Sequence, residues 1–402
     1  MLKQLNGNFT VRFLLSNNQP GSMTRITADT ASTFARKGIR TVILFPAVDW
    51  WDYRLFALRW LKGRRRWKTL LKMAVDFSVG LFFRRKWCGF KYYAVDSHVG
   101  TTRYFLRPSA STWKENEMTV VHPPYLIPHL LRTLDHLNVP IVSALHMNLE
   151  KALKNPDPMT AAWYEHWVAR ERLVSVPRYT TSRTAKEAAE RLGIPVRRII
   201  HDGSLDLDLF HPARGPAERN GAPVVTLYCD THPQKGQAVG AQAFRMLKGR
   251  HPNVRLCSIG KVIPEFASLF DHSYGFLHGT ELVKAIQASD IFVYPSLYDG
   301  FPAPPLQAMA CGAALVTTAV EGVNEYAVHE ENALLCLPGD AEAIKNQVLR
   351  LIQDRELLRK LKTHGPETAQ RYSVEQSAQQ LLDFLREVHR EMPFRLNNGV
   401  VV

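Results

Sequence analysis

The chain has 402 residues, of which 46% are hydrophobic and 22% charged, and its formal net charge is +14. This length is too great for one ordinary hydrophobic core and favours two domains, and the composition excludes a disordered chain. The positive charge predicts an acidic partner, either a nucleotide diphosphate or an anionic membrane surface. Nucleic acid is not expected as a partner, because the sequence has no Cys and His pairs at zinc-binding spacing and no aromatic RNA-binding strand.

The five cysteines are an odd number, widely spaced and mostly set in apolar runs, which is typical of buried thiols in a reducing compartment. The first ten residues lack the apolar core of a signal peptide. We therefore expect a cytoplasmic protein.

The first half begins with a βαβ pattern. A strand at residues 11–15 leads into a polar loop containing Gly21, a helix at 26–37 and a strand at 41–45. Open parallel sheets bind ligands in such loops, at the carboxyl ends of strands. Gly21 either serves the turn alone or lets the backbone approach a ligand, and the local sequence leaves both interpretations open.

Two further strands, at 118–121 and 141–145, flank a predicted helix at 125–138. His146 directly follows the second strand. A histidine in that position is, by itself, more often structural or solvated than catalytic.

A helix with an N-cap at Ser182 or Thr184 and an end at Gly193 follows. The stretch 211–223 is rich in Pro, Gly and charge and is typical of an interdomain linker.

The second half alternates short apolar strands with helices, which predicts a parallel sheet covered on both faces. The strands are expected at 224–229, 254–259, 291–294 and 314–317, and the helices at 237–248, 281–288, 306–311 and 374–390. The predicted fold class is α/β with two Rossmann-like, doubly wound domains. Their expected bounds are 1–213 and 214–373, followed by a helix and tail at 374–402.

One motif is far more specific than these patterns. Asp299 lies in the loop Asp-Gly-Phe-Pro after a strand, and Gln307 lies in the first turns of the helix that follows. The N-terminus of a helix favours an anion, and Gly300 lets the backbone approach a ligand. This stretch resembles the sugar-nucleotide signature of retaining GT-B glycosyltransferases of family 4 (glycosyl transferases group 1). That signature has two glutamates eight positions apart around a Gly-Phe-Gly-Leu-Pro-like loop. Asp299 and Gln307 keep the spacing but change both residue types.

The resemblance extends from Val11 to Val388 and implies two domains facing a cleft, with the last helix crossing back to the first domain. It implies that Asp299 orients the hydroxyls of the donor sugar, that the backbone N–H groups of Gly300 and Phe301 hold the donor, and that Gln307 holds the ribose. Glu325 is an alternative ribose ligand or a helix cap.

Lys235 matches the family's phosphate-binding lysine, five residues after a position that is usually arginine. This chain has Asp230 there, so Lys261 and Arg25 are candidates to supply the missing cation. A solvated lysine at a helix start is the structural alternative for Lys235.

The resemblance also implies that Gly21 and Ser22 contact the donor diphosphate or the acceptor, and that His146 is catalytic. No metal and no cofactor are expected, and the nucleoside diphosphate-sugar is a co-substrate.

Residues 54–91 combine many Arg and Lys residues with Trp and Phe residues. This composition favours peripheral binding to an anionic membrane, on the inner face of the cell membrane. Residues 69–83 are too short, and interrupted by charges, to span a bilayer. An excursion of the first domain that packs its aromatic residues on its own core is the alternative.

The predicted function is transfer of a sugar, with retention, from a nucleoside diphosphate-sugar to a growing, lipid-linked glycan. The alternative is a catalytically silent relative that binds sugar nucleotide or membrane and organises glycan assembly, which the changes at Asp230, Asp299 and Gln307 favour. A sugar-phosphate isomerase of the similar epimerase type is a third alternative, but the Asp-Gly-Phe-Pro loop fits a transferase better.

Overall fold

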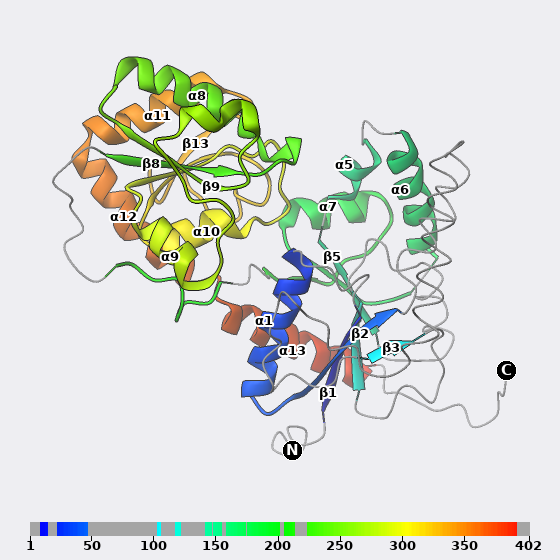
Figure 1. The fold of residues 1–402 in the computed structure, drawn as a ribbon. Coiled ribbons are helices and arrows are strands. Elements are labelled where there is room, and N and C mark those ends of the chain that lie inside the picture. Colours follow the sequence, from blue (N-terminus) through cyan, green and yellow to red (C-terminus); the bar gives the residue numbers. More distant parts are fainter. Residues whose placement is uncertain are drawn as a thin grey trace, which may run out of the picture. The chain divides into compact units, whose positions relative to one another are not determined.

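The computed structural model (Figure 1) describes residues 9–14, 22–46, 103–105, 117–121, 141–146, 148–154, 158–173, 175–201, 205–213 and 223–391. Gly21, the basic segment 54–91 and the expected helix at 125–138 lie outside these residues. The chain divides into two compact units, one made of Met1–His201 with Ser377–Val402 and the other of Asp202–Gln376. The sequence analysis placed the corresponding boundaries after residues 213 and 373.

Unit 1, which contains the N-terminus, is built on a parallel sheet with strand order β3-β2-β1-β4-β5-β6-β7. Its strands are β1 Thr10–Leu14, β2 Arg40–Pro46, β3 Arg103–Phe105, β4 Glu117–Val121, β5 Ile141–Leu145, β6 Arg178–Thr180 and β7 Arg198–Ile199. The helices described in this unit are α1 Ser22–Arg36, α5 Leu149–Leu153, α6 Pro158–Glu171, α7 Arg183–Arg191 and α13 Val374–Glu391, which begins in the other unit.

Local signals in the sequence set the ends of these helices. The Ser182 hydroxyl accepts a hydrogen bond from the Ala185 N–H at 3.2 Å and caps α7, and Gly193 follows its end with a φ of +77°. Helix α1 begins at Ser22 rather than at the expected Ile26. The extension has a simple cause, because no Gly or Pro lies between Ser22 and Ile26 to interrupt the helix.

The core of unit 1 lies on both sides of its sheet. One cluster joins inward residues of β1, such as Val11 and Phe13, to Phe34 of α1 and to apolar residues of α13 from Ala378 to Val388. A second cluster packs α5, α6 and α7 around the buried Trp167. The C-terminal helix is therefore part of the core of the N-terminal unit.

Unit 2 has a second parallel sheet, with strand order β10-β9-β8-β11-β12-β13. Its strands are β8 Val224–Cys229, β9 Arg255–Gly260, β10 His272–Ser273, β11 Ile291–Tyr294, β12 Ala314–Thr318 and β13 Leu334–Cys336. Its α-helices are α8 Gln237–Arg250, α9 Gly279–Gln287, α10 Ala303–Ala310, α11 Ala341–Gln353 and α12 Arg355–Gln370.

Side chains of the strands in unit 2 alternate between two cores. Ile291 and Val293 of β11 pack with α8, α11 and α12, whereas Phe292 and Tyr294 pack with α9 and α10. In Figure 1, α8 and α11 lie on one side of this sheet, and α9 and α10 lie on the other. A strand buried on both faces has to be apolar throughout, which is why the short apolar runs were recognisable in the sequence. The expectation of two Rossmann-like α/β domains is confirmed.

Candidate functional site

The strand order of unit 2 defines a topological switch point. From β8 the chain continues to β9 and β10 on one side, whereas β11 lies on the other side of β8 and is followed outward by β12 and β13. The connections after β8 and β11 therefore leave the carboxyl edge of the sheet in opposite directions, and this edge is the topological switch point. Open α/β sheets bind their ligands at this position.

An ion pair between Lys235 and Asp299 occupies this switch point. Lys235 follows β8 and Asp299 follows β11, and the Lys235 Nζ lies 2.9 Å from both Oδ1 and Oδ2 of Asp299. The side chain of Lys235 is 27% exposed and that of Asp299 is 13% exposed, so the pair is partly accessible to solvent or a ligand. The structure thus brings together the two residues that the sequence singled out as phosphate-binding and sugar-binding.

Two further hydroxyls converge on the same carboxylate. Tyr294, the last residue of β11, donates to Asp299 Oδ2 at 2.5 Å, and the Ser296 hydroxyl lies 2.9 Å from the same oxygen. Burial, reinforced by the charge of Asp299, raises the pKa of the Tyr294 hydroxyl well above its ordinary value. The hydroxyl therefore stays protonated and acts as a donor. The sequence analysis did not identify either residue, although a polar residue at the end of an apolar strand is a usable signal.

The loop that carries Lys235 is hydrogen-bonded directly to the loop after β11. The Gln234 carbonyl accepts from the Leu297 N–H at 2.7 Å, and Gly236 has a φ of +67°. A Cβ added at Gly236 would lie 1.9 Å from the Pro295 carbonyl oxygen, so only glycine fits there. These contacts hold the backbone of Lys235 against the end of β11.

Asp230 lies where a cation was expected, and its carboxylate serves the turn. Its Oδ1 accepts a hydrogen bond from the His232 N–H at 2.8 Å. Lys261, one of the candidate substitutes, follows β9 and is exposed, and its carbonyl accepts from the Gln237 side chain at 3.0 Å. Ser22 and Arg25 lie in α1 of unit 1.

The N-terminus of α10 offers fewer backbone donors than a helix usually does. The helix begins at Ala303, and its N-cap and its second and third residues are Pro302, Pro304 and Pro305. Of the four N–H groups that a helix start normally leaves without a partner, only that of Ala303 exists. The helix dipole remains, but an anion at this end depends more on side-chain cations than the sequence motif suggested.

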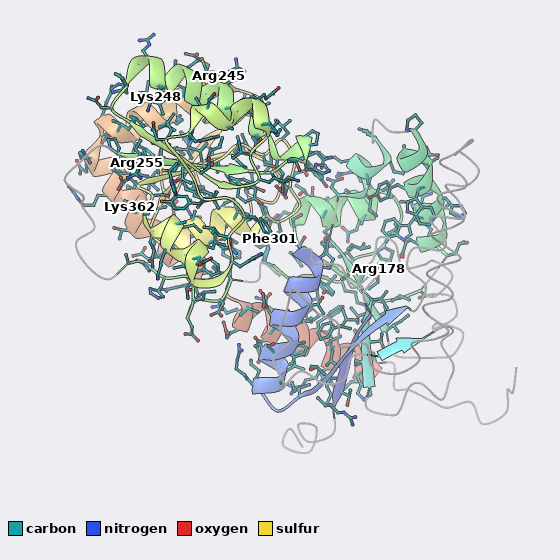
Figure 2. All side chains as sticks on the ribbon, viewed as in Figure 1. Arg178, Arg245, Lys248, Arg255, Phe301 and Lys362 are labelled. Carbon is teal, nitrogen blue, oxygen red and sulfur yellow. The ribbon has the colours of Figure 1, made fainter. Side chains whose placement is uncertain are left out.

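Other predicted residues surround α10. Gly300 lies tightly against Gly322, where an added Cβ would approach the Gly300 oxygen to 2.2 Å. Phe301, labelled in Figure 2, forms a mutual aromatic cluster with Tyr326 and Tyr372, with ring centroids 5.6 to 5.9 Å apart.

Gln307 and Glu325 differ in accessibility. Gln307 is only 5% exposed. Glu325 is half-buried in a turn, and its backbone carbonyl accepts a hydrogen bond from the Tyr372 hydroxyl at 2.7 Å. A ligand that reaches the Gln307 side chain would have to displace neighbouring groups.

His146 belongs to unit 1. It follows β5, is half-buried, and its ring packs edge-on against Tyr179 with centroids 6.1 Å apart. Among the described residues, no group of three or more His, Cys, Asp or Glu side chains could hold a metal ion. The described helices include none that is long and apolar enough to cross a membrane.

The fold is GT-B, as comparison with solved structures shows. The structure of HepE from Anabaena in complex with UDP aligns over 94% of this chain and 100% of that chain, with a TM-score of 0.68 and 15% identity. At this identity the likeness concerns the fold alone.

Sequence comparisons give one family match and several partial matches. Residues 214–368 match the family model "Glycosyl transferases group 1". The serotype-specific mannosyltransferase WbdA of Escherichia coli is 31% identical over 109 residues, which are 27% of this chain and 13% of that protein. An N-acetylgalactosaminyltransferase of Campylobacter jejuni that acts on N,N'-diacetylbacillosaminyl-diphospho-undecaprenol is 31% identical over 123 residues, which are 30% of this chain and 33% of that protein. The matches therefore span between about an eighth and a third of these relatives.

Proposed function

We propose that this protein is a glycosyltransferase that moves a sugar, with retention, from a nucleoside diphosphate-sugar to a glycan or lipid-linked acceptor. The observation that carries the proposal is the Lys235–Asp299 pair at the switch point of a unit that matches the group 1 glycosyltransferases. The UDP in the HepE complex and the lipid-linked acceptor of the Campylobacter enzyme support the classes of donor and acceptor.

The proposed chemistry is charge stabilisation of a departing diphosphate. Lys235 supplies a fixed cation, and such preorganised charge is worth more in a partly buried site than in water. Lys261 and Arg25 are the proposed additional cations, and the departing phosphate accepts the proton of the acceptor hydroxyl. No metal and no cofactor take part in the proposed reaction.

The remaining proposed roles follow the resemblance. Asp299 and the backbone of Gly300 and Phe301 hold the donor sugar, and Gln307 or Glu325 holds the ribose. Gly21 and Ser22 are proposed to contact the diphosphate or the acceptor, and His146 is proposed to be catalytic. We place this chemistry in the cytoplasm.

Hydrolysis or transfer from a panel of UDP- and GDP-sugars, in wild type and in Lys235→Ala, tests the proposal. We expect turnover in wild type and a loss of about a hundredfold or more in the variant, as for removal of one stabilising group. Lys248→Ala is the matched control, because Lys248 is also paired with an aspartate, Asp271 at 2.9 Å, but lies on α8. Equal activity of the two variants would show that Lys235 has no role in the site.

A catalytically silent relative is the second candidate. It is favoured by Asp230 in place of the usual cation, by the changes at Asp299 and Gln307, and by the three prolines at the start of α10. This candidate predicts that sugar nucleotides raise the melting temperature while neither wild type nor Lys235→Ala turns them over.

We also propose that residues 54–91 bind an anionic membrane surface, on the sequence argument given above. Sedimentation with anionic liposomes, in wild type and in a variant with Arg64, Arg65 and Arg66 changed to Glu, tests this. Unchanged binding of the variant would exclude the segment as the membrane contact.

A further inference from the structure

The Asp299 carboxylate is occupied by groups from its own unit. Its Oδ2 lies within hydrogen-bonding distance of the Tyr294 hydroxyl, the Ser296 hydroxyl and the Lys235 Nζ, and its Oδ1 also contacts Lys235. A carboxylate oxygen has about two lone pairs, so Oδ2 is saturated. Asp299 is therefore oriented by protein groups before any sugar arrives.

The two hydroxyls do not contribute equally. The single Ser296 proton has three acceptors within reach, namely the carbonyls of Gln234 at 3.1 Å and Tyr298 at 3.0 Å and the Asp299 Oδ2 at 2.9 Å. The Tyr294 hydroxyl donates to Asp299 and lies 3.3 Å from the Lys235 Nζ, from which it can accept. Tyr294 thus touches both members of the ion pair.

The position of Tyr294 is fixed by its surroundings. It is the last residue of β11, its side chain is fully buried, and its ring packs against Tyr228 with centroids 5.2 Å apart. A buried hydroxyl without a partner is costly, so the hydrogen bond to Asp299 is maintained. The rigid end of β11 therefore fixes the position of the Asp299 carboxylate through the Tyr294 hydroxyl.

We propose that Tyr294 is a positioning residue, which fixes Asp299 and through it the Lys235 Nζ at the switch point. Under the proposed function, on which this step rests, Asp299 is the resting partner of Lys235, and the donor diphosphate competes with it for the lysine. The short aspartate side chain fits this role, because it stays close to the strand end that holds it.

The test measures the reactivity of individual lysines with an amine-acylating reagent, read by mass spectrometry without any ligand. In Tyr294→Phe, which keeps the ring, we expect the labelling rate of Lys235 to rise about threefold to tenfold, as for the net loss of one intramolecular hydrogen bond. Lys248 is the internal control, because its carboxylate partner Asp271 is independent of Tyr294. In Asp299→Asn, a second variant in case Tyr294→Phe does not fold, Lys235 labelling is expected to rise at least as much.

An unchanged Lys235 rate in folded Tyr294→Phe, relative to Lys248, overturns the inference, whatever Asp299→Asn shows. If Tyr294→Phe does not fold, an unchanged rate in Asp299→Asn overturns it. A separate arm adds UDP to the wild type, and protection of Lys235 supports the proposed donor site. If UDP and GDP give no protection while Tyr294→Phe still exposes Lys235, the donor-site function fails and the positioning role stands.

Discussion

Gly236 is the most constrained position beside Lys235, and Gly236→Ala is the sharpest test of the site's architecture. An alanine there would adopt a left-handed φ of +67°, which costs about 1 to 2 kcal/mol. Its Cβ would also lie 1.9 Å from the Pro295 oxygen, a backbone atom that cannot rotate away, and relieving such overpacking costs about 1 to 3 kcal/mol. We therefore expect unit 2 to lose about 2 to 5 kcal/mol of unfolding free energy.

Alanine substitutions at two other glycines separate the cost of the left-handed φ from the cost of the steric clash. Chemical unfolding followed by circular dichroism measures both. Gly339 has a φ of +87° with nothing within 4 Å of an added Cβ, so Gly339→Ala is expected to lose only the first contribution, about 1 to 2 kcal/mol. Gly249 lies in α8 with open space and an ordinary φ, and Gly249→Ala is expected to be neutral or to gain up to about 1 kcal/mol. If Gly236→Ala is no less stable than Gly339→Ala, the close approach to Pro295 does not constrain the loop.

The remaining predictions concern charges. Arg178→Met removes the partner of the buried Glu171, 2.9 Å away, and is expected to cost about 3 to 5 kcal/mol, whereas Arg197→Met at an exposed pair is expected to change stability by less than about 1 kcal/mol. Burial already raises the pKa of Glu171 above its ordinary 4.5, so in Arg178→Met the folded state binds a proton at Glu171 more tightly than the unfolded state does. The stability of this variant is therefore expected to fall as the pH rises above 4.5. A stability that rises with pH would contradict this. Asp230→Arg replaces a negative charge in the loop of Lys235 by a positive one. We expect this change to raise the affinity for UDP about threefold to tenfold, measured by titration calorimetry at low salt. No gain in affinity would indicate that residue 230 does not face the phosphates.

The strands of unit 2 were predictable because each is a short apolar run between turn residues. The bounds of β8 and β11 agree with the sequence-based ranges, since both faces of these strands are buried. The start of α10 was placed at Leu306, whereas the helix begins at Ala303. Consecutive prolines suggest a loop, yet they are tolerated in the first turn, where their missing N–H groups have no intrahelical partner.

The site was predictable only in part. Lys235 and Asp299 were each found from their local motifs, but they are 64 residues apart, and their contact follows from the strand order rather than from either motif. Tyr294 and Ser296 were missed because the sequence does not show how the chain turns after β11, and only that turn brings their hydroxyls to Asp299. The three prolines were visible in the sequence, but their effect on the number of backbone donors depends on where the helix starts.

Those prolines have a consequence for the thermodynamics of recognition. Pro302, Pro304 and Pro305 each restrict the backbone before folding as well as after it, so the loop retains little conformational entropy to lose. A ligand that docks there meets a preorganised surface, and its affinity is not reduced by the cost of ordering that segment. If the proposed function holds, adaptation to different sugars would have to come from changes in the side chains around this rigid segment.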